Sequence, residues 1–291
     1  MTAPLEGLIT KGVGGFYTAV APDGLAHTLR AQGKLRRQKL TPMVGDRVRF
    51  QPGGEGEEGW LLAILPRKNS LTRPPVANID LALLVVAAAS PEADLLLLDR
   101  MLLYARQAGI RPVVAVNKCD LNPETAAAIQ RAYQGAAEGA FLVSARTGEG
   151  VEALREALSG SVHALAGQSG AGKSTLINRL YGLTLVTGQV SRIERGKHTT
   201  RHSELIQLPG GGMVLDTPGF SLLESQLIEP IHLKESYPEF SPYEGECRFS
   251  PCAHASEPGC AVRQAVGGEI DPGRHERYKL LFDEMTQRWK D

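Results

Sequence analysis

The sequence contains few cysteines, no long apolar run and no excess of charge of either sign. Four cysteines in 291 residues are too few for a secreted scaffold of this length held together by disulfides. Because no stretch of about 18 consecutive apolar residues is present, we expect no membrane-spanning helix and no membrane partner. The first ten residues lack the basic start and apolar stretch of a secretory signal, so we expect a cytoplasmic protein. With 42% hydrophobic residues, the chain can form a core, and its length indicates about two domains, or three.

The absence of net charge conceals a difference between the two ends of the chain. Residues 1–72 carry ten Lys and Arg against six Asp and Glu, whereas residues 226–291 carry eight against twelve. The basic excess is greatest in one short segment, which contains Lys34, Arg36, Arg37 and Lys39. Such a cluster is either a solvated loop or a contact for the phosphate backbone of a nucleic acid. The second interpretation makes these four side chains candidate RNA-binding residues.

The first 72 residues have the pattern of a small β-barrel. Segments suited to strands at 16–20, 46–50 and 60–64 are bounded by turns rich in glycine and proline, and about five short strands fit in this length. The number of strands alone does not distinguish an OB-type barrel from an SH3-like one. Three aromatic side chains could stack on RNA bases, although each fits the barrel core better: Phe16, Tyr17 and Phe50.

Residues 73–225 change to alternating strands and helices. Continuous apolar runs at 79–89 and 112–116 are typical of strands that are buried on both faces of a parallel sheet. Segments with helical character follow them, at 94–108 and at 123–133. This alternation predicts a doubly wound α/β domain.

The strongest motif is a phosphate-binding loop in this middle region. It follows a strand-like segment and opens a helical one, and it fits the pattern G-x-x-x-x-G-K-[ST]. Its residues are Gly167, Gln168, Ser169, Gly170, Ala171, Gly172, Lys173 and Ser174, with Thr175 next in the helix. Glycines let the backbone turn successive N–H groups toward an anion at the helix N-terminus. We expect Lys173 to reach the β- and γ-phosphates of a nucleotide, and Ser174 to hold Mg²⁺.

A second motif favours guanine over adenine. Residues 117–120 read Asn-Lys-Cys-Asp and follow a predicted strand, so they lie at the strand end where α/β domains bind ligands. The Asp120 carboxylate can accept the N1–H and the 2-amino group of guanine, and adenine has neither donor. After the next strand, Ser144-Ala145 can supply a backbone N–H to the guanine oxygen. The predicted guanine-binding residues are Asn117, Lys118, Cys119, Asp120, Ser144 and Ala145.

Two further segments are candidates for the magnesium and γ-phosphate contacts. The residues Asp-Thr-Pro-Gly run from Asp216 to Gly219 after a short apolar strand. Asp216 could bind Mg²⁺ through water, and the N–H of Gly219 could sense the γ-phosphate. Between this motif and the phosphate loop lies a polar segment at 195–200, in which Thr200 or Thr199 could complete the magnesium shell.

The C-terminal cysteines have the composition of a structural zinc site. Cys247, Cys252, His254 and Cys260 are spaced C-x4-C-x-H-x5-C, and three thiolates with one imidazole complete a tetrahedral shell. Reduced surface thiols are the alternative. Because this proline-rich segment has little apolar content, metal binding would supply folding free energy that it otherwise lacks. We therefore expect one structural Zn²⁺.

In their combined order, these motifs resemble those of the circularly permuted GTPases. The guanine-binding loops precede the phosphate loop, and the Asp-Thr-Pro-Gly motif comes last. Only the connections change, since each loop still ends a strand on one face of the sheet. The small barrel and the cysteine cluster make the chain similar to the RsgA (YjeQ) family. The resemblance implies a multidomain α/β protein with an OB-type barrel at 1–72, a circularly permuted GTPase domain at 73–225 and a zinc-binding domain with a helix at 226–291.

The same resemblance implies a GTPase that binds the small ribosomal subunit and its rRNA and assists late maturation of that subunit. The subunit would stimulate GTP hydrolysis, which is coupled to release, and the protein would act as a monomer with Mg²⁺ and GTP or GDP. Many GTPases place a water-orienting Gln after the D-x-x-G motif, but Phe220 stands there. His198 is the candidate catalytic residue, as a water-orienting group or a weak base. A solvent-facing loop histidine is the other interpretation.

Two other functions stay open. One is a GTP-dependent regulator that binds RNA or protein and does not act on ribosomes. The other is a GTPase of large-subunit assembly with the same permuted order, which the barrel and the cysteine cluster together disfavour. Comparing how small and large subunits affect the rate of GTP hydrolysis would separate these three functions.

Overall fold

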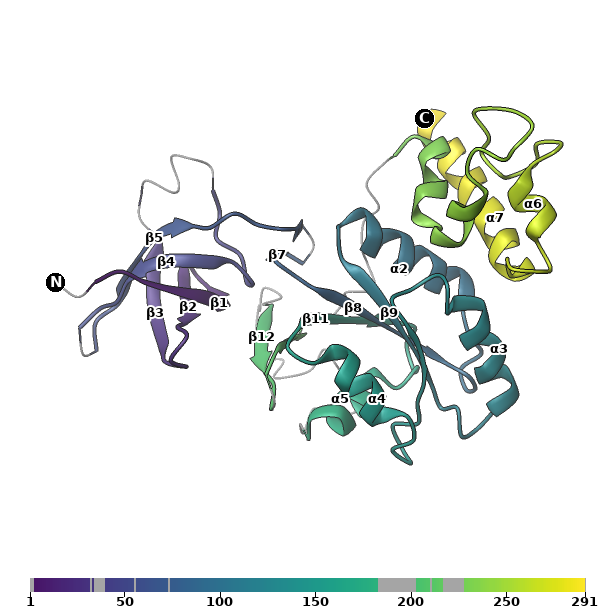
Figure 1. Ribbon diagram of the computed structural model, residues 1–291. Coiled ribbons are helices and arrows are strands. Elements are labelled where there is room, and N and C mark those ends of the chain that lie inside the picture. Colours follow the sequence, from purple (N-terminus) through teal and green to yellow (C-terminus); the bar gives the residue numbers. More distant parts are fainter. Residues whose placement is uncertain are drawn as a thin grey trace. The chain divides into compact units, whose positions relative to one another are not determined.

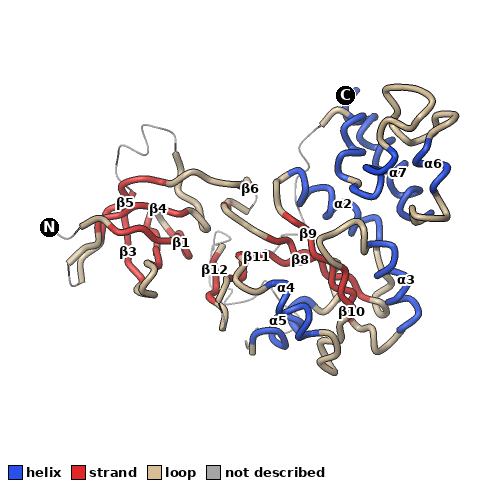
Figure 2. The backbone as a smooth tube through the Cα atoms, viewed as in Figure 1, coloured by secondary structure: helices blue, strands red, loops and turns tan. Residues whose placement is uncertain are grey.

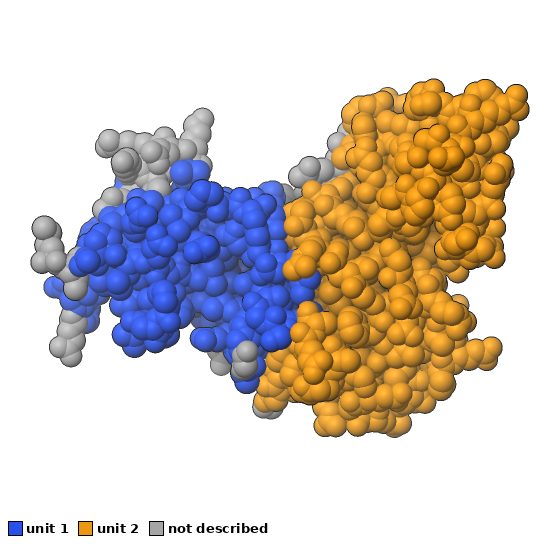
Figure 3. Space-filling model, viewed as in Figure 1, with its two compact units in different colours: residues 1–81, 158–165, 186–222 blue, residues 82–157, 166–185, 223–291 orange. Residues whose placement is uncertain are grey.

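The computed structural model divides into two compact units, which Figure 3 shows in blue and orange. The first unit comprises residues 1–81, 158–165 and 186–222, and the second comprises residues 82–157, 166–185 and 223–291. The structure describes residues 3–31, 33, 40–54, 56–72, 74–182, 203–209, 211–216 and 228–290. Within these described ranges, no helix is long and apolar enough to cross a membrane.

The N-terminal strands close into a five-stranded barrel (Figure 1). Its strands are β1 (Leu5–Val13), β2 (Phe16–Val20), β3 (Ala26–Ala31), β4 (Arg47–Gln51) and β5 (Gly59–Ile64). β1 pairs with both β2 and β4, β2 pairs with β3, β3 runs parallel to β5, and β5 pairs with β4. These pairings close the ring in the order of an OB-type barrel. The structure thus distinguishes an OB-type barrel from an SH3-like one, which the number of strands alone does not.

Alternation along each strand sends every second side chain into the barrel. Ile9, Leu29 and Leu61 are fully buried there. Phe50, one of the three aromatic candidates for stacking, is also fully buried and belongs to the core. Phe16 is instead 38% exposed, so it is available at the surface.

The same unit contains two further groups of strands. β6 (Ser70–Leu71) and β7 (Val76–Ala77) pair as a short ribbon. β13 (Met213–Asp216) lies between β11 (Val162–Gly167), to which it is parallel, and the antiparallel β12 (Glu204–Gln207). The pairing of Leu215 with Ala164 brings the last residue of β13, Asp216, level with Leu165.

The α/β part of the second unit has the predicted alternation of strands and helices. β8 (Leu81–Ala87), β9 (Arg111–Asn117) and β10 (Ala140–Leu142) are neighbours in one sheet, and β9 and β10 are parallel. The helices are α2 (Leu95–Gln107), α3 (Pro123–Tyr133), α4 (Val151–Leu158) and α5 (Lys173–Tyr181). Figure 2 shows α2 and α3 on one side of these strands and α4 and α5 on the other. All of β8 is buried, and so is all of β9 after its first residue, as predicted for strands covered on both faces.

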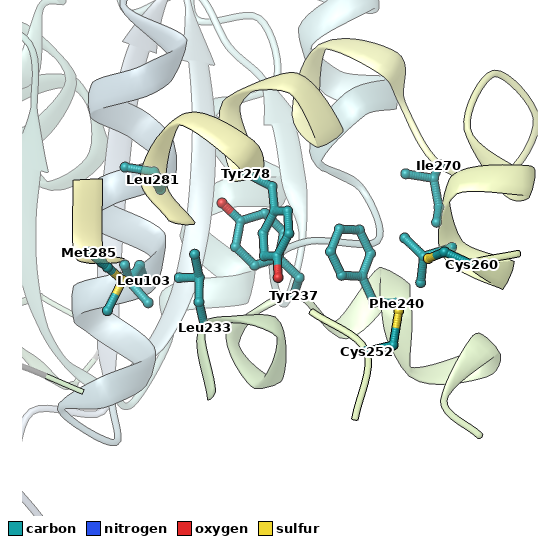
Figure 4. Packing of buried hydrophobic residues seen from close by; sticks show 11 residues of the cluster. Leu103, Leu233, Tyr237, Phe240, Cys252, Cys260, Ile270, Tyr278, Leu281 and Met285 are labelled. Atoms are coloured by element: carbon teal, nitrogen blue, oxygen red, sulfur yellow. The ribbon is translucent and has the colours of Figure 1, made fainter. Parts of the chain in front are cut away.

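The C-terminal residues form a small core with α2 in the same unit. Their elements are η1 (Pro230–Ser236), η2 (Pro238–Tyr243), α6 (Ala261–Ala265) and α7 (Pro272–Lys290). Tyr237 and Phe240 each meet the Tyr278 ring edge-on, at centroid distances of 4.8 and 5.0 Å. Figure 4 shows these rings between Leu103 of α2 and the buried sulfur of Cys252. The cysteine-bearing segment is therefore packed on a helix of the α/β part.

Candidate nucleotide site and metal centre

The phosphate loop connects β11 to α5, and its glycines adopt conformations that other residues resist. Gly170 and Gly172 have φ angles of 79° and 89°, and Gly172 is the N-cap of α5. A Cβ on Gly167 would lie 2.2 Å from the carbonyl oxygen of Val85, and one on Gly172 would lie 2.4 Å from Nδ2 of Asn117. Both ends of the loop therefore require glycine. A loop of this kind at a helix N-terminus suits an anion.

Lys173 bends back onto the phosphate loop. Its Nζ donates to the carbonyl oxygens of Gly167 at 2.7 Å and Gln168 at 2.8 Å. Burial lowers the pKa of Lys173, because the charged amine loses contact with water. Phosphate oxygens close to Nζ would favour the charged form, so this side chain is suited to bind a nucleotide phosphate. Ser174, the predicted magnesium ligand, is buried in the first turn of α5.

Asn117 connects the phosphate loop to the guanine-binding loops. Its Nδ2 donates to the carbonyl oxygen of Ala171 at 2.8 Å, and its Oδ1 accepts the N–H of Ala145 at 3.1 Å. Lys118 adopts a positive φ of 62° and donates from Nζ to the carbonyl oxygen of Gly170 at 2.9 Å. These bonds bring three sequence motifs, which are separate along the chain, to one place.

Asp120 holds its carboxylate beside Ser144 in the loop that follows β10. The hydrogen bond from the Ser144 hydroxyl lowers the pKa of the Asp120 carboxyl most, and the charge of Arg146 lowers it further against the opposing effect of desolvation. Arg146 Nη2 donates to Asp120 Oδ2 at 3.0 Å. An ionised carboxylate has two acceptor oxygens, as the N1–H and 2-amino group of guanine require. Burial raises the pKa of the neighbouring Cys119 thiol, so that residue acts as a small apolar side chain.

Some of the predicted site residues have no described position. Outside the described residues lie His198, Thr199, Thr200 and Gly219, as well as the basic cluster of Lys34, Arg36, Arg37 and Lys39. The description of Asp216 is limited to its backbone, which ends β13. The roles of these residues stay predictions.

The C-terminal cluster brings four potential metal ligands together. The ligand atoms of Cys247, Cys252, His254 and Cys260 all lie within 4.8 Å of one another. Nδ1 of His254 is 3.6 Å from the sulfur of Cys247 and 3.4 Å from that of Cys260. Burial raises the pKa of the Cys252 and Cys260 thiols, so a bound cation would be needed to hold all three sulfurs as thiolates. The set fits a metal ion that takes sulfur and nitrogen in tetrahedral geometry.

Two carboxylates that the sequence analysis missed support this cluster. Oε1 of Glu244 lies 3.1 Å from Nε2 of His254, so Nε2 can donate its proton while Nδ1 offers its lone pair to the metal. Glu257 accepts the backbone N–H of Ala253 at 2.7 Å and that of Ala255 at 3.0 Å. The turn that carries His254 is thereby fixed. An acidic residue close to a predicted ligand is too common in sequences to reveal either role.

The profile of the RsgA GTPase family matches residues 64–226, and that of the RsgA N-terminal domain matches residues 6–61. The chain belongs to the RsgA GTPase family. Two relatives carry the name small ribosomal subunit biogenesis GTPase RsgA. The relative from Geobacillus thermodenitrificans is 44% identical, over 97% of this chain and 98% of its own. The relative from Ruminiclostridium cellulolyticum is 43% identical, over 95% of this chain and 92% of its own.

Solved structures agree with this membership of the RsgA family. YjeQ from Thermotoga maritima matches with a TM-score of 0.84 and 34% identity, over 98% of this chain and 99% of that protein. YloQ, described as a circularly permuted GTPase, matches with a TM-score of 0.82 and 34% identity, over 98% of this chain and 96% of that protein. The predicted family, the permuted GTPase fold and the OB-type barrel are therefore confirmed. As a member of this family, the chain is a GTPase.

Proposed function

We propose that this GTPase binds the small ribosomal subunit and assists its late maturation, and that the subunit stimulates GTP hydrolysis coupled to release. Relatives named for small-subunit biogenesis share 40–44% identity with nearly the whole chain. One observation carries the GTP-dependent part of the proposal. Asn117 bonds to the phosphate loop and to the Ser144-Ala145 loop at once, which supports a single nucleotide site formed by both loops.

The proposed roles follow from the contacts around Asn117. Lys173 exchanges the two carbonyl oxygens that it now contacts for phosphate oxygens. Asp120 accepts from guanine, and the N–H of Ala145, which now donates to Asn117 Oδ1, turns to the guanine oxygen. Contacts to GTP are assigned to residues 117–120, 144–145 and 167–175 and to Gly219. A bound Mg²⁺ would neutralise charge on the phosphate oxygens. Its proposed ligands are Ser174 and either Thr200 or Thr199, with Asp216 bound to it through water.

We assign the orientation of the attacking water to His198. The position after the D-x-x-G motif carries Phe220, which has no hydrogen-bonding group to orient water. A histidine can accept a proton or hold water at neutral pH. The chain alone should therefore hydrolyse GTP slowly, with stimulation by the subunit depending on His198.

We propose one structural Zn²⁺ for the C-terminal cluster. Three thiolates and one imidazole fill a tetrahedral shell and leave no position for a reacting water. The proposed domains are 1–72, 73–225 and 226–291, in a monomer that works in the cytoplasm, where small subunits are assembled. The basic cluster at 34–39 would contact rRNA phosphates, so RNA affinity should fall as salt rises.

GTP hydrolysis, measured alone and with purified small or large subunits at one salt concentration, tests the proposal. A large increase with small subunits alone is expected. Stimulation by large subunits alone would indicate a factor of large-subunit assembly, and no stimulation by either would favour a regulator that does not act on ribosomes. Lys173→Ala serves as the inactive control. Unchanged stimulated turnover in His198→Ala would remove His198 from the site.

A further inference from the structure

Three exposed side chains form a row across the outer face of the barrel. Phe16 of β2 pairs in register with Arg30 of β3, and Arg30 pairs with Trp60 of β5. Phe16 and Trp60 are 38% and 48% exposed, whereas Leu29 and Leu61, which adjoin Arg30 and Trp60 along the chain, are fully buried. Because neighbouring strands lie about 4.8 Å apart, the two aromatic residues stand about 10 Å apart with the guanidinium between them.

The guanidinium of Arg30 has a defined place in this row. Its central carbon lies 4.6 Å from the centroid of the Phe16 ring, a distance at which cation and ring attract. Arg30 also pairs with the carboxylate of Glu58, in the loop that precedes β5, and Nη2 lies 3.3 Å from Glu58 Oε1. Its side chain is still 51% exposed. The row therefore offers planar groups to solvent from a rigid sheet.

Planar groups in the order aromatic, cationic, aromatic are suited to unpaired nucleic acid bases. Every base has a π face that stacks on an aromatic ring or on an arginine. The row lies next to the turn that joins β1 to β2 and the loop that joins β4 to β5, and OB-type barrels bind oligonucleotides with these loops and with the face of their second and third strands. Residues 1–72 carry a net charge of +4, from ten basic and six acidic residues, which favours a polyanion.

A protein partner fits this surface less well. Stable protein interfaces need about 800 Å² from each partner, whereas this row comprises three side chains and has a charge at its centre. Its neighbours in the next row are Thr18 and Thr28, which pair in register on β2 and β3. Hydroxyl groups beside the aromatic residues suit the phosphates and sugars of a nucleic acid better than an apolar protein surface.

We propose that Trp60 and the Arg30–Phe16 pair form a stacking site for unpaired RNA bases. This proposal rests on the proposed function, because it names the part of an RNA that the barrel would recognise. Bases in a duplex keep their faces covered, so the site selects single-stranded segments. Glu58 and RNA compete for Arg30, so RNA binding breaks the ion pair between Arg30 and Glu58.

The two tryptophans of the chain allow a direct test. They are Trp60 and Trp289, so Trp289→Phe leaves Trp60 as the sole indole fluorophore in the full-length protein. A single-stranded RNA of about twelve nucleotides, within the site size of OB-type barrels, should quench Trp60 fluorescence and saturate. A duplex of the same sequence should leave the fluorescence unchanged.

Binding by variants supplies the quantitative part of this test. Trp60→Ala should weaken single-strand affinity about tenfold, whereas Trp60→Phe keeps a stacking ring and most of the affinity. The salt dependence of binding should stay the same in Trp60→Ala, because no phosphate contact is lost. Leu25→Ala is the matched control, since Leu25 is an apolar side chain, 61% exposed, in the turn at the other end of β2 and β3. Glu58→Gln should raise the affinity, because it replaces the ion pair that holds Arg30 by a weaker neutral contact.

Equal single-strand affinity in Trp60→Ala and the unaltered chain would overturn the stacking site, and so would quenching by the duplex. A change in sedimentation caused by Trp60→Ala, without loss of RNA affinity, would assign the row to a second copy of the chain. Thermal unfolding and circular dichroism check that the barrel of the variant is folded, because the phosphate loop and the guanine-binding residues lie in the other compact unit. Stimulation by small subunits, measured in parallel, separates the two proposals. If small subunits stimulate GTP hydrolysis but Trp60→Ala binds single-stranded RNA as well as the unaltered chain does, only the stacking site is refuted. If Trp60→Ala loses single-strand affinity but small subunits do not stimulate the unaltered chain, only the proposed function is refuted.

Discussion

Arg274 of α7 is buried against Asp99 of α2, although 175 residues separate them in the sequence. The side chain of Arg274 is 2% exposed and that of Asp99 is fully buried. The guanidinium lies 5.0 Å from the Tyr133 ring centroid and 4.7 Å from that of Tyr237. Nε of Arg274 also donates to Glu239 at 2.9 Å. The C-terminal residues are therefore attached to the α/β part by buried charges as well as by apolar packing.

Removing Arg274 should destabilise the attachment of α7 strongly. Arg274→Ala leaves the Glu239 carboxylate without this arginine in a buried environment, and losing one partner of a buried pair costs about 3–5 kcal/mol. Hydrogen exchange of residues 272–290 measures the effect as lost protection. Lys279→Ala is the control, since its pair with Glu276 is largely exposed and contributes about 0–1 kcal/mol. Equal protection in the two variants would show that apolar packing alone holds α7.

Asp120 should decide which nucleotide base is bound. Asp120→Asn replaces one acceptor oxygen by a donor, which no longer matches the 2-amino group of guanine but matches the 2-oxo group of xanthine. A site that hydrogen-bonds a substrate group rejects analogues without it by about 10⁴-fold, so GTP affinity should fall by about 100-fold or more and XTP should bind better. Titration with fluorescent GDP and XDP measures both.

Arg146→Gln is the matched control for Asp120→Asn. Arg146 contacts the same carboxylate from an exposed position, and its loss leaves both acceptor oxygens in place. We expect this variant to keep its preference for guanine. A preference for GTP that survives Asp120→Asn would contradict the role given to Asp120.

The phosphate loop and the guanine-binding motif could be predicted because their chemistry is local. Glycine, lysine and aspartate are required at fixed spacings there, and Asn117 then joins the loops as expected of strand ends on one face of a sheet. The grouping of the four potential metal ligands at 247–260 could be predicted for the same reason. The strand pattern also located the barrel, but not its topology, because the pairing of β3 with β5 joins residues that are distant along the chain.

Other features depend on contacts between distant residues and leave no trace in the sequence. Asp99 lies within an apolar helical segment, and nothing in the sequence indicates that Arg274 is its partner. In the sequence Trp60 is an ordinary residue of a predicted strand, and only the strand register shows that it lies beside Arg30. Glu244 is one of many acidic residues near the predicted ligands. These contacts become visible only in the tertiary structure.

Buried His163 should make the protein less stable in mild acid. It lies in β11 with Nδ1 3.2 Å from the Ser161 hydroxyl, and desolvation lowers the pKa of His163 from 6.5 to about 4. Between these pH values the unfolded chain binds a proton that the folded chain does not. The contribution of neutral His163 to the free energy of unfolding is therefore complete above pH 6.5. It declines as the pH falls, by about 3 kcal/mol at pH 4. Thermal unfolding of His163→Gln and the unaltered chain from pH 7.5 to pH 5 measures the difference.

His163→Gln should show a smaller loss of unfolding temperature over this range, because glutamine does not titrate. His232→Gln is the control. His232 is exposed, and the hydrogen bond that it donates to Glu235 raises the pKa of His232, so replacing His232 should leave the decline in place. Parallel curves for His163→Gln and the unaltered chain would rule out His163 as the source of acid sensitivity.

Glu244 should strengthen metal binding although it is not itself a ligand. Its Oε1 lies 3.1 Å from Nε2 of His254, and its Oε2 lies 3.1 Å from Nζ of Lys234. The carboxylate makes the imidazole more basic and holds its orientation, and replacing such partners lowers metal affinity about 10–100-fold. Glu244→Gln keeps a neutral acceptor, so we expect about a tenfold loss. Competition for Zn²⁺ with a chromophoric chelator measures it directly. Glu246→Gln, an exposed change two residues away, should retain full affinity, and equal Zn²⁺ affinities in the two variants would limit Glu244 to its ion pair with Lys234.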